Sequence, residues 1–249
     1  MYSLLFFIED ILLEQIVQDL LKVYRQNSYP PSLNQLVLSD YESLSSRIAF
    51  RLINTASNQS FLKTVPHIPW MDLSIVFYLY IQGNDNGIMT AAVSDYHMKT
   101  WGITADELYT QSLLNTPRLF PPVISSMACI LENLDPEHLQ YNPSLPETPF
   151  YVLTNKNGIN GAACVLYKDV IKNFAEGMDR DILILPSSIH EVLLLPDDDQ
   201  LPYRDLADLV TFINQTEVPA EDRLSNQVYR YSRLKDQFSV VSFSPSSVC

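Results

Sequence analysis

The stretch from Asp72 to Gln82, DLSIVFYLYIQ, constrains the fold more than any other feature, because it belongs in a protein interior. β-Branched and aromatic residues dominate it, which is typical of a buried strand. An Asn-Asp-Asn-Gly turn at 84–87 follows, and 88–93 is again apolar, so the pattern predicts a β-hairpin. Residues 47–54 favour another strand, with a helix as the alternative.

Helix signals lie on both sides of this hairpin. Residues 9–26 carry apolar side chains on one face at helical spacing, and Leu4–Ile8 before them is expected to pack on the core or on a second subunit. Thr104 and Glu107 form a capping box at the start of another helix, after Gly102 ends a short helical segment. Further helices are expected at 123–134, at 168–176 closed by Gly177, and from Pro202 to about Gln215.

The remaining segments favour extended chain. Pro117, Pro121 and Pro122 predict an extended stretch after the capped helix. Strands are expected at 150–154, 181–185 and 192–195, and an edge hairpin at 228–231 and 238–243. The expected fold class is therefore α+β, with mixed or antiparallel sheets and packed helices.

Two segments of the chain resemble each other. Asn86-Gly87-Ile88 with Ala91-Ala92 recurs as Asn157-Gly158-Ile159 with Ala162-Ala163, each after an apolar strand. Either a duplicated strand–turn–strand–helix unit or the ordinary preference of turns for Asn-Gly explains this. The expected organisation is an N-terminal helical segment at 1–40, α+β halves at 41–134 and 150–243, a proline-rich linker at 135–149 and a flexible tail at 244–249.

Composition restricts the partners of the chain. Its 249 residues carry a formal net charge of −13, and such a field disfavours binding to nucleic acids. No stretch approaches the ~20 apolar residues of a membrane helix, so no membrane partner is expected. The three cysteines show no paired spacing, which favours a reducing cytoplasm.

Searches for local catalytic motifs find none. The chain has no glycine-rich phosphate loop, no His-Glu-x-x-His, no Cys-x-x-Cys and no Gly-x-Ser-x-Gly. The acidic run Asp197–Asp199 lacks the spaced ligands and the glycine of a calcium loop, and a solvated loop is favoured. Neither a cofactor nor a metal is therefore expected.

Candidate site residues gather at turns and helix ends. The segment 186–191 places hydroxyl, imidazole and carboxylate groups between two strands, where they can position a nucleophile, bind an anion or simply form a turn. His97 and Trp101 share one face of a helix that Asp95 can cap, which favours a core contact over a ligand platform. Arg118 can hold a carboxylate ligand or form an internal salt bridge. The candidates are Ser187, Ser188, His190, Glu191, Asp95, His97, Trp101, Asn115 and Arg118.

Several segments of the chain together form a recognisable pattern: Val65-Pro66-His67, Trp101-Gly102, Asn115-Thr116-Pro117-Arg118, the run from Tyr151 through Gly161 to Glu191, and Val228-Tyr229-Arg230-Tyr231. In these segments the chain resembles a bacterial family known as domain of unknown function 5688, from anaerobic gut bacteria. The resemblance implies a cytoplasmic bacterial protein and draws attention to His190, His97 and Arg118. It also implies further sequence before the first helix in other members.

Two functions follow as expectations. The missing catalytic constellation and the apolar N-terminal segment favour a non-catalytic binding or protein-interaction module. Its partner would be a protein or a small molecule, and a homo-oligomer through the N-terminal helix is also expected. The alternative is a small-molecule enzyme, hydrolase-like, with its site near Ser187–Glu191 and His190 sharing a pocket with a second titratable group.

Overall fold

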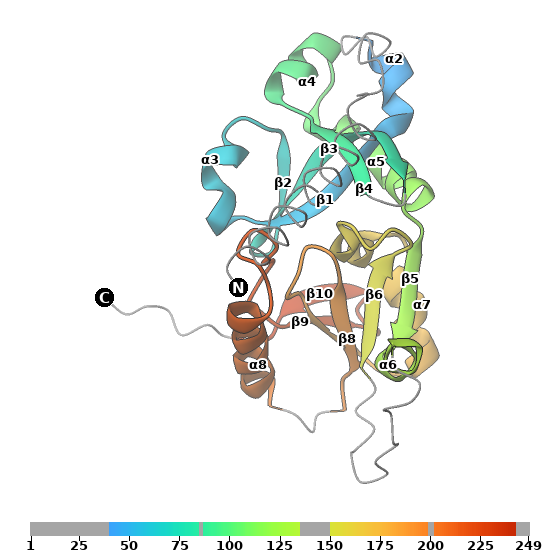
Figure 1. The fold of residues 1–249 in the computed structure, drawn as a ribbon, viewed down its shortest axis with the longest axis vertical. Coiled ribbons are helices and arrows are strands. Elements are labelled where there is room, and N and C mark those ends of the chain that lie inside the picture. Colours follow the sequence, from blue (N-terminus) through green and yellow to red (C-terminus); the bar gives the residue numbers. More distant parts are fainter. Residues whose placement is uncertain (1–39, 85–86, 135–149, 199–201, 243–249) are drawn as a thin grey trace, which may run out of the picture. The chain divides into compact units, whose positions relative to one another are not determined.

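The computed structural model describes residues 40–84, 87–134, 150–198 and 202–242. The predicted helix at 9–26, the apolar stretch 4–8, the linker at 135–149 and the tail at 244–249 lie outside these residues. The described part contains two antiparallel sheets with helices packed on them, so the α+β class is confirmed (Figure 1).

The first sheet is organised around the long apolar strand predicted from the sequence. Its strands are β1 (Ile48–Asn54), β2 (His67–Trp70), β3 (Leu73–Asn84) and β4 (Gly87–Ala92). Tyr78 of β3 lies opposite Ala49 of β1 and opposite Ala92 of β4, so β1 and β4 pair with opposite edges of β3. The predicted strand at 47–54 and the β3–β4 hairpin are therefore confirmed.

Short helices border this sheet, and one longer helix packs on it. They are α2 (Tyr41–Leu44), η2 (Ser45–Arg47), η3 (Ala56–Asn58), α3 (Gln59–Leu62), α4 (Asp95–Trp101) and α5 (Ala105–Leu119). The predicted capping box starts α5, because the Glu107 carboxylate accepts from the Thr104 backbone N–H at 2.8 Å. Gly102 ends α4 in the left-handed conformation, at φ 68°, as expected.

The predicted extended stretch was wrong over 117–119, because α5 continues through Pro117 to Leu119, and a strand begins only at Pro122. A proline removes one hydrogen bond from the last turns of the helix. Tertiary bonds to β1 hold those turns instead. The Thr116 hydroxyl accepts from the Phe50 backbone N–H at 3.1 Å, and the Asn115 amide donates to the Ile48 carbonyl at 2.9 Å.

The second sheet has six strands in the order β10-β9-β7-β8-β6-β5. They are β5 (Pro122–Ser126), β6 (Tyr151–Asn155), β7 (Ile182–Leu185), β8 (Val192–Pro196), β9 (Tyr229–Ser232) and β10 (Gln237–Val240). The expected helix at 123–134 was wrong over its first part, because 122–126 pairs with β6 and only α6 (Met127–Leu134) is helical. A short apolar run does not distinguish a strand from a helix until its pairing partner is known.

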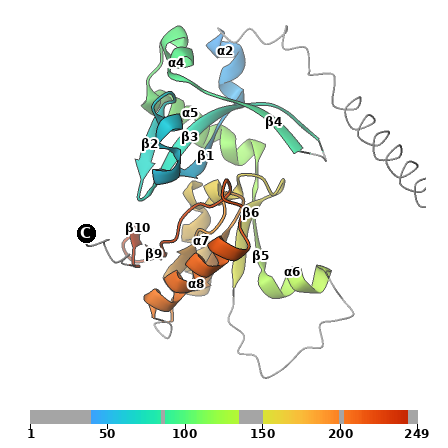
Figure 2. The same cartoon turned by 60° about the vertical axis from the view of Figure 1, so that its left-hand side comes forward.

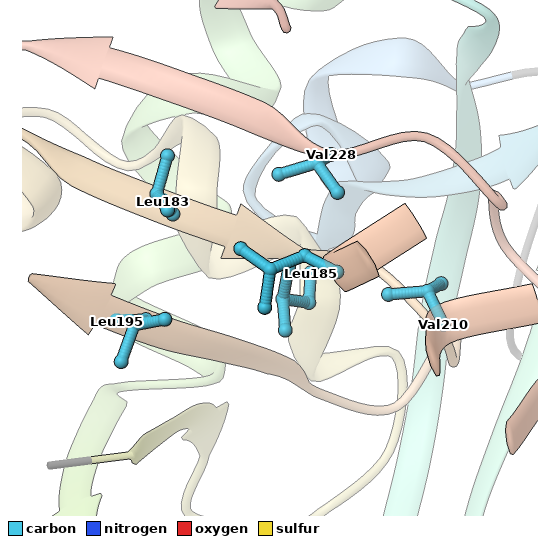
Figure 3. Packing of buried hydrophobic residues seen from close by; sticks show 6 residues of the cluster. Leu183, Leu185, Leu195, Val210 and Val228 are labelled. Carbon is cyan, nitrogen blue, oxygen red and sulfur yellow. The ribbon is translucent and has the colours of Figure 1, made fainter. Parts of the chain in front are cut away.

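Helices cover this sheet, and one supplies much of its core. They are η4 (Gly161–Leu166), α7 (Val170–Met178) and α8 (Tyr203–Thr216). Leu206 and Val210 of α8 pack on the buried Leu183, Leu185 and Leu195 of β7 and β8. Figure 3 shows Val210 with these three leucines, and Figure 2 brings α8 forward. Burying each such side chain contributes roughly 1.5–3 kcal/mol.

The end of α7 differs from the prediction. Gly177 lies inside the helix, and Asp179 adopts the left-handed conformation at φ 54°. Its backbone N–H bonds to the carbonyls of Ala175 and Glu176, so a short polar side chain takes the capping position expected for glycine.

The two resembling segments have different structures. In the first segment β3 pairs with β4, which completes a hairpin. In the second, the residues after Asn157-Gly158 form η4, a 3-10 helix, where a repeat of the first unit would place a returning strand. What the described parts of the two segments share is the strand that comes first, β3 or β6.

Hydrogen bonds and aromatic contacts join the two sheets. Asp72, between β2 and β3, accepts from the Ser225 hydroxyl at 2.6 Å and from the Tyr229 hydroxyl. Burial, reinforced by the Asp72 carboxylate, raises the pKa of Tyr229, so this hydroxyl stays protonated and donates. Trp70 contacts the rings of Tyr229 and Phe238 edge-on, at centroid distances of 5.4 and 5.6 Å.

We predict that Asp72→Ala destabilises the protein by about 2–4 kcal/mol, because two hydroxyls lose their acceptor at a partly buried junction. Urea denaturation followed by circular dichroism measures the change. Glu221→Ala, at an exposed position, is the matched control and is expected to change stability by less than about 0.5 kcal/mol. Equal stabilities of the two variants would contradict this role of Asp72.

Candidate functional site

The connection between β7 and β8, residues 186–191, contains the serine, histidine and carboxylate side chains singled out in the sequence. Ser188 forms an isolated antiparallel bridge with Arg223. The Ile189 backbone N–H donates to the Asp222 carbonyl at 2.8 Å, and the Leu224 N–H donates to the Ser187 carbonyl at 3.1 Å. The segment 222–225 therefore lies against this turn and holds its backbone.

The His190 imidazole is half-buried, and both of its ring nitrogens are engaged. Nδ1 accepts from the Asn160 backbone N–H at 3.3 Å, and Nε2 lies 3.5 Å from Oδ1 of Asp222. Because Nδ1 acts as an acceptor, the geometry assigns the ring proton to Nε2, which faces the carboxylate. No ring nitrogen is then left to take a proton from a hydroxyl nucleophile.

The Ser188 side chain stabilises the backbone of this turn. The Ser188 hydroxyl, in a residue only 5% exposed, accepts from the His190 backbone N–H at 3.0 Å. This is the side-chain-to-backbone bond through which serine stabilises turns. Of the explanations open for residues 186–191, the contacts fit the turn best.

Gly161 allows η4 to approach this turn closely. A Cβ atom at position 161 would lie far inside van der Waals contact of the Thr154 hydroxyl and the His190 carbonyl, and 2.9 Å from the Asn155 nitrogen. The Thr154 hydroxyl donates to the same His190 carbonyl at 2.8 Å. β6, η4 and the 186–191 turn therefore meet at one crowded point that admits only glycine.

A second polar cluster adjoins His190 through Asn160. Arg51 of β1 lies opposite Val76, and Tyr78 of β3 lies opposite Ala49, so Arg51 and Tyr78 are diagonal neighbours on one face of the first sheet. The Asn160 side chain lies beside the Tyr78 hydroxyl and favours its ionised form. Burial raises the pKa of Tyr78, against the opposing effect of the Arg51 guanidinium, so the phenol is neutral.

Arg51 differs from the other members of this cluster. Its Nε is buried, and among the described residues no hydrogen bond or ion pair engages the side chain. Burial lowers the pKa of Arg51. One sequence signal could have identified it: a single charge inside the otherwise apolar run IAFRLI. Tyr78, Asn160 and Asp222 carried no comparable signal.

The residues around His97 have a structural role. His97 Nδ1 accepts from the Ser94 backbone N–H at 3.0 Å, which caps α4. Its ring stacks on Trp101 at 5.4 Å, and Trp101 contacts Tyr41 of α2. Asp95 lies in the first turn of α4. His97 and Trp101 are both partly exposed, and α4 has no fully buried residue.

Asn115 and Arg118 hold the start of β1. Asn115 donates to the carbonyls of Ser45 and Ile48, and Arg118 donates to the Ser46 carbonyl at 2.7 Å. Of the sequence candidates, Ser187, Ser188, His190 and Glu191 share one turn. Asp95, His97, Trp101, Asn115 and Arg118 engage α2, α4 and β1 instead. No hydrogen bond or ion pair found within the described segments links the two groups.

An apolar groove lies between α6, α8 and the second sheet. Eight residues line a cavity of about 180 Å³, and only the serine among them is polar: Met127, Phe150, Leu185, Ser187, Leu193, Leu209, Val210 and Ile213. Beside it, α8 exposes Leu209 by 41% and Phe212 by 62%. Exposed apolar side chains around an apolar groove are typical of a binding surface.

Three other kinds of site find no support in the described segments. No group of three or more His, Cys, Asp or Glu residues there could hold a metal ion. Burial raises the pKa of the Cys164 thiol to about 12, so this cysteine is not a thiolate nucleophile. No helix in these segments is long and apolar enough to cross a membrane.

Comparison with known proteins gives a family and no activity. A model described as "Family of unknown function (DUF5688)" matches residues 7–233. No curated protein and no solved structure matches the chain.

We predict that Gly161→Ala destabilises the protein by at least about 2 kcal/mol, because the new methyl group would force the η4 backbone away from His190. Gly177→Ala is the control. It lies inside α7 with no atom within 4 Å of the added Cβ, and is expected to stabilise by about 0.5–1 kcal/mol. Urea denaturation measures both, and the same sign for both would contradict the close approach.

Proposed function

The chain belongs to the family of unknown function DUF5688, and we propose that it is a non-catalytic binding module that docks an amphipathic helix of a protein partner. The observation that carries the proposal is the apolar groove beside the exposed Leu209 and Phe212 of α8. A helix that places apolar residues on one face can fill such a groove with side chains one turn apart.

Charge indicates the chemistry of the partner. Asp205 and Asp208 are exposed on α8 beside the groove, and the whole chain carries a net charge of −13. A partner helix with lysine or arginine next to its apolar face is attracted by this field, whereas an acidic helix is repelled. We therefore propose a basic amphipathic helix as the occupant.

The engaged groups of the 186–191 turn support binding over hydrolysis. A hydrolase would need an imidazole nitrogen free to accept the proton of a nucleophile. His190 instead uses Nδ1 for the Asn160 N–H and Nε2 for Asp222, and the Ser188 hydroxyl bonds to backbone. The second titratable group expected to share a pocket with His190, whether Asp95, His97 or Arg118, makes its contacts elsewhere.

Peptide display on the immobilised full-length chain tests the chemistry of the occupant. We expect the selected peptides to carry apolar residues at positions i, i+3 or i+4, and i+7, with Lys or Arg between them. Selection of acidic peptides, or of peptides without helical spacing, would contradict the proposal.

We predict that Phe212→Asp weakens binding of the selected peptides at least tenfold, because it places a charge on the apolar rim of the groove. Leu114→Asp is the matched control, since Leu114 is 71% exposed on α5, and it is expected to leave affinity unchanged. Fluorescence anisotropy of labelled peptide measures both variants, with circular dichroism as the check of folding.

Light scattering of the same proteins measures their oligomeric state, and so distinguishes binding of another protein from binding of a second copy of this chain. A full-length dimer that Phe212→Asp converts into a monomer would replace the proposed partner by self-association. Equal affinities of the two variants for the peptide would reject the groove as the binding surface.

A further inference from the structure

We propose that Arg51, with Tyr78 and Asn160, forms a binding site for the carboxylate group of a small-molecule ligand. These residues come from β1, β3 and the loop between β6 and η4, and none of them lines the apolar groove. The proposal is therefore independent of the docking of a partner helix.

The first argument is the unpaired charge of Arg51. Its Nε is buried, and no described residue hydrogen bonds or ion pairs with the side chain. By contrast, the guanidinium of Arg230 is paired with two carboxylates, Asp181 at 3.0 Å and Asp197 at 3.1 Å. A buried cation without a counter-charge is costly, so a folded protein keeps one mainly where an anion will pair with it.

The second argument is the set of donors beside the guanidinium. Tyr78 is only 4% exposed, and no hydrogen bond in which it donates is found among the described residues. The Asn160 side chain beside it acts on the phenol as a donor would, so the phenolic proton is left for a ligand. A guanidinium and a neutral hydroxyl are the donors with which proteins bind carboxylates, the guanidinium often through two parallel bonds.

Charge balance favours a carboxylate over a phosphate. One guanidinium neutralises one negative charge, which a carboxylate supplies. A phosphate dianion would leave a net negative charge at a partly buried site in a chain of net charge −13. The nearby His190 side chain does not change this balance, because its Nε2 faces the Asp222 carboxylate at 3.5 Å.

Access is provided by Arg51 itself. The residue as a whole is partly exposed although its Nε is buried, whereas Tyr78 is buried. A ligand would therefore reach the outer nitrogens of the guanidinium first, with the Tyr78 hydroxyl behind them. A small monocarboxylate fits this arrangement better than a bulky polyanion.

Thermal unfolding of the full-length chain tests the proposal. The probes are sodium acetate, pyruvate and benzoate, with sodium phosphate as a separate arm and sodium chloride keeping the ionic strength constant. We expect a saturable rise of the Tm with at least one carboxylate, and no saturable rise with phosphate. A response to phosphate alone, or to no anion, would overturn the proposal.

Amino-acid substitutions test whether the carboxylate binds at Arg51. Arg51→Met keeps the length of the side chain without its charge, and is expected to weaken carboxylate binding at least tenfold. Tyr78→Phe should weaken it severalfold, and Arg204→Met, at an exposed position on α8, should leave it unchanged. If Arg51→Met does not fold, Arg51→Lys replaces it, with a loss of at least tenfold expected because lysine lacks the planar fork. Retained affinity in the Arg51 variant would refute the site.

Discussion

The hydrogen bonds of Asp72 are the interaction on which the arrangement of the two sheets depends. This carboxylate follows β2, immediately before the central strand of the first sheet, and accepts hydroxyl hydrogen bonds from Ser225 and Tyr229 of the second. Its neighbour Trp70 adds aromatic contacts to the same strands, and the Asn54 amide donates to the Leu224 carbonyl at 2.8 Å. A short segment before β9 thus connects the sheets and also holds the 186–191 turn.

The contacts between these elements show which polar residues stabilise the fold and which are left without a partner. His190 and Ser188 lie where β6, η4, the 186–191 turn and segment 222–225 meet, and their contacts stabilise that meeting point. Arg51 lies on the first sheet, and Tyr78 and Asn160 lie between it and His190. The charge of Arg51 has no hydrogen-bond or ion-pair partner among the described side chains. Arg51 and the groove of α8 are therefore better candidates for binding a ligand or a partner than His190.

The sequence predicted well those elements whose signals are local. The capping box of Thr104 and Glu107 forms within the first turn of α5, where it supplies acceptors to backbone N–H groups that have no partner in the helix. The β3–β4 hairpin follows from two apolar strands that are adjacent in the sequence. Two of the predictions that failed depended on distant partners. Helix α5 passes Pro117 because Thr116 and Asn115 bond to β1, and residues 122–126 are a strand because β6 pairs with them.

The sequence by itself determined the class of the fold, the absence of local catalytic motifs and the acidic charge of the chain. These depend on composition and on near neighbours. Only the tertiary structure decided which polar groups are satisfied, because Arg51, Tyr78 and Asn160 come from separate elements and a missing partner cannot be seen in a linear pattern. It likewise decided that the apolar stripe of α8 is part buried core and part exposed surface, because the sheet covers Leu206 and Val210 and leaves Phe212 uncovered.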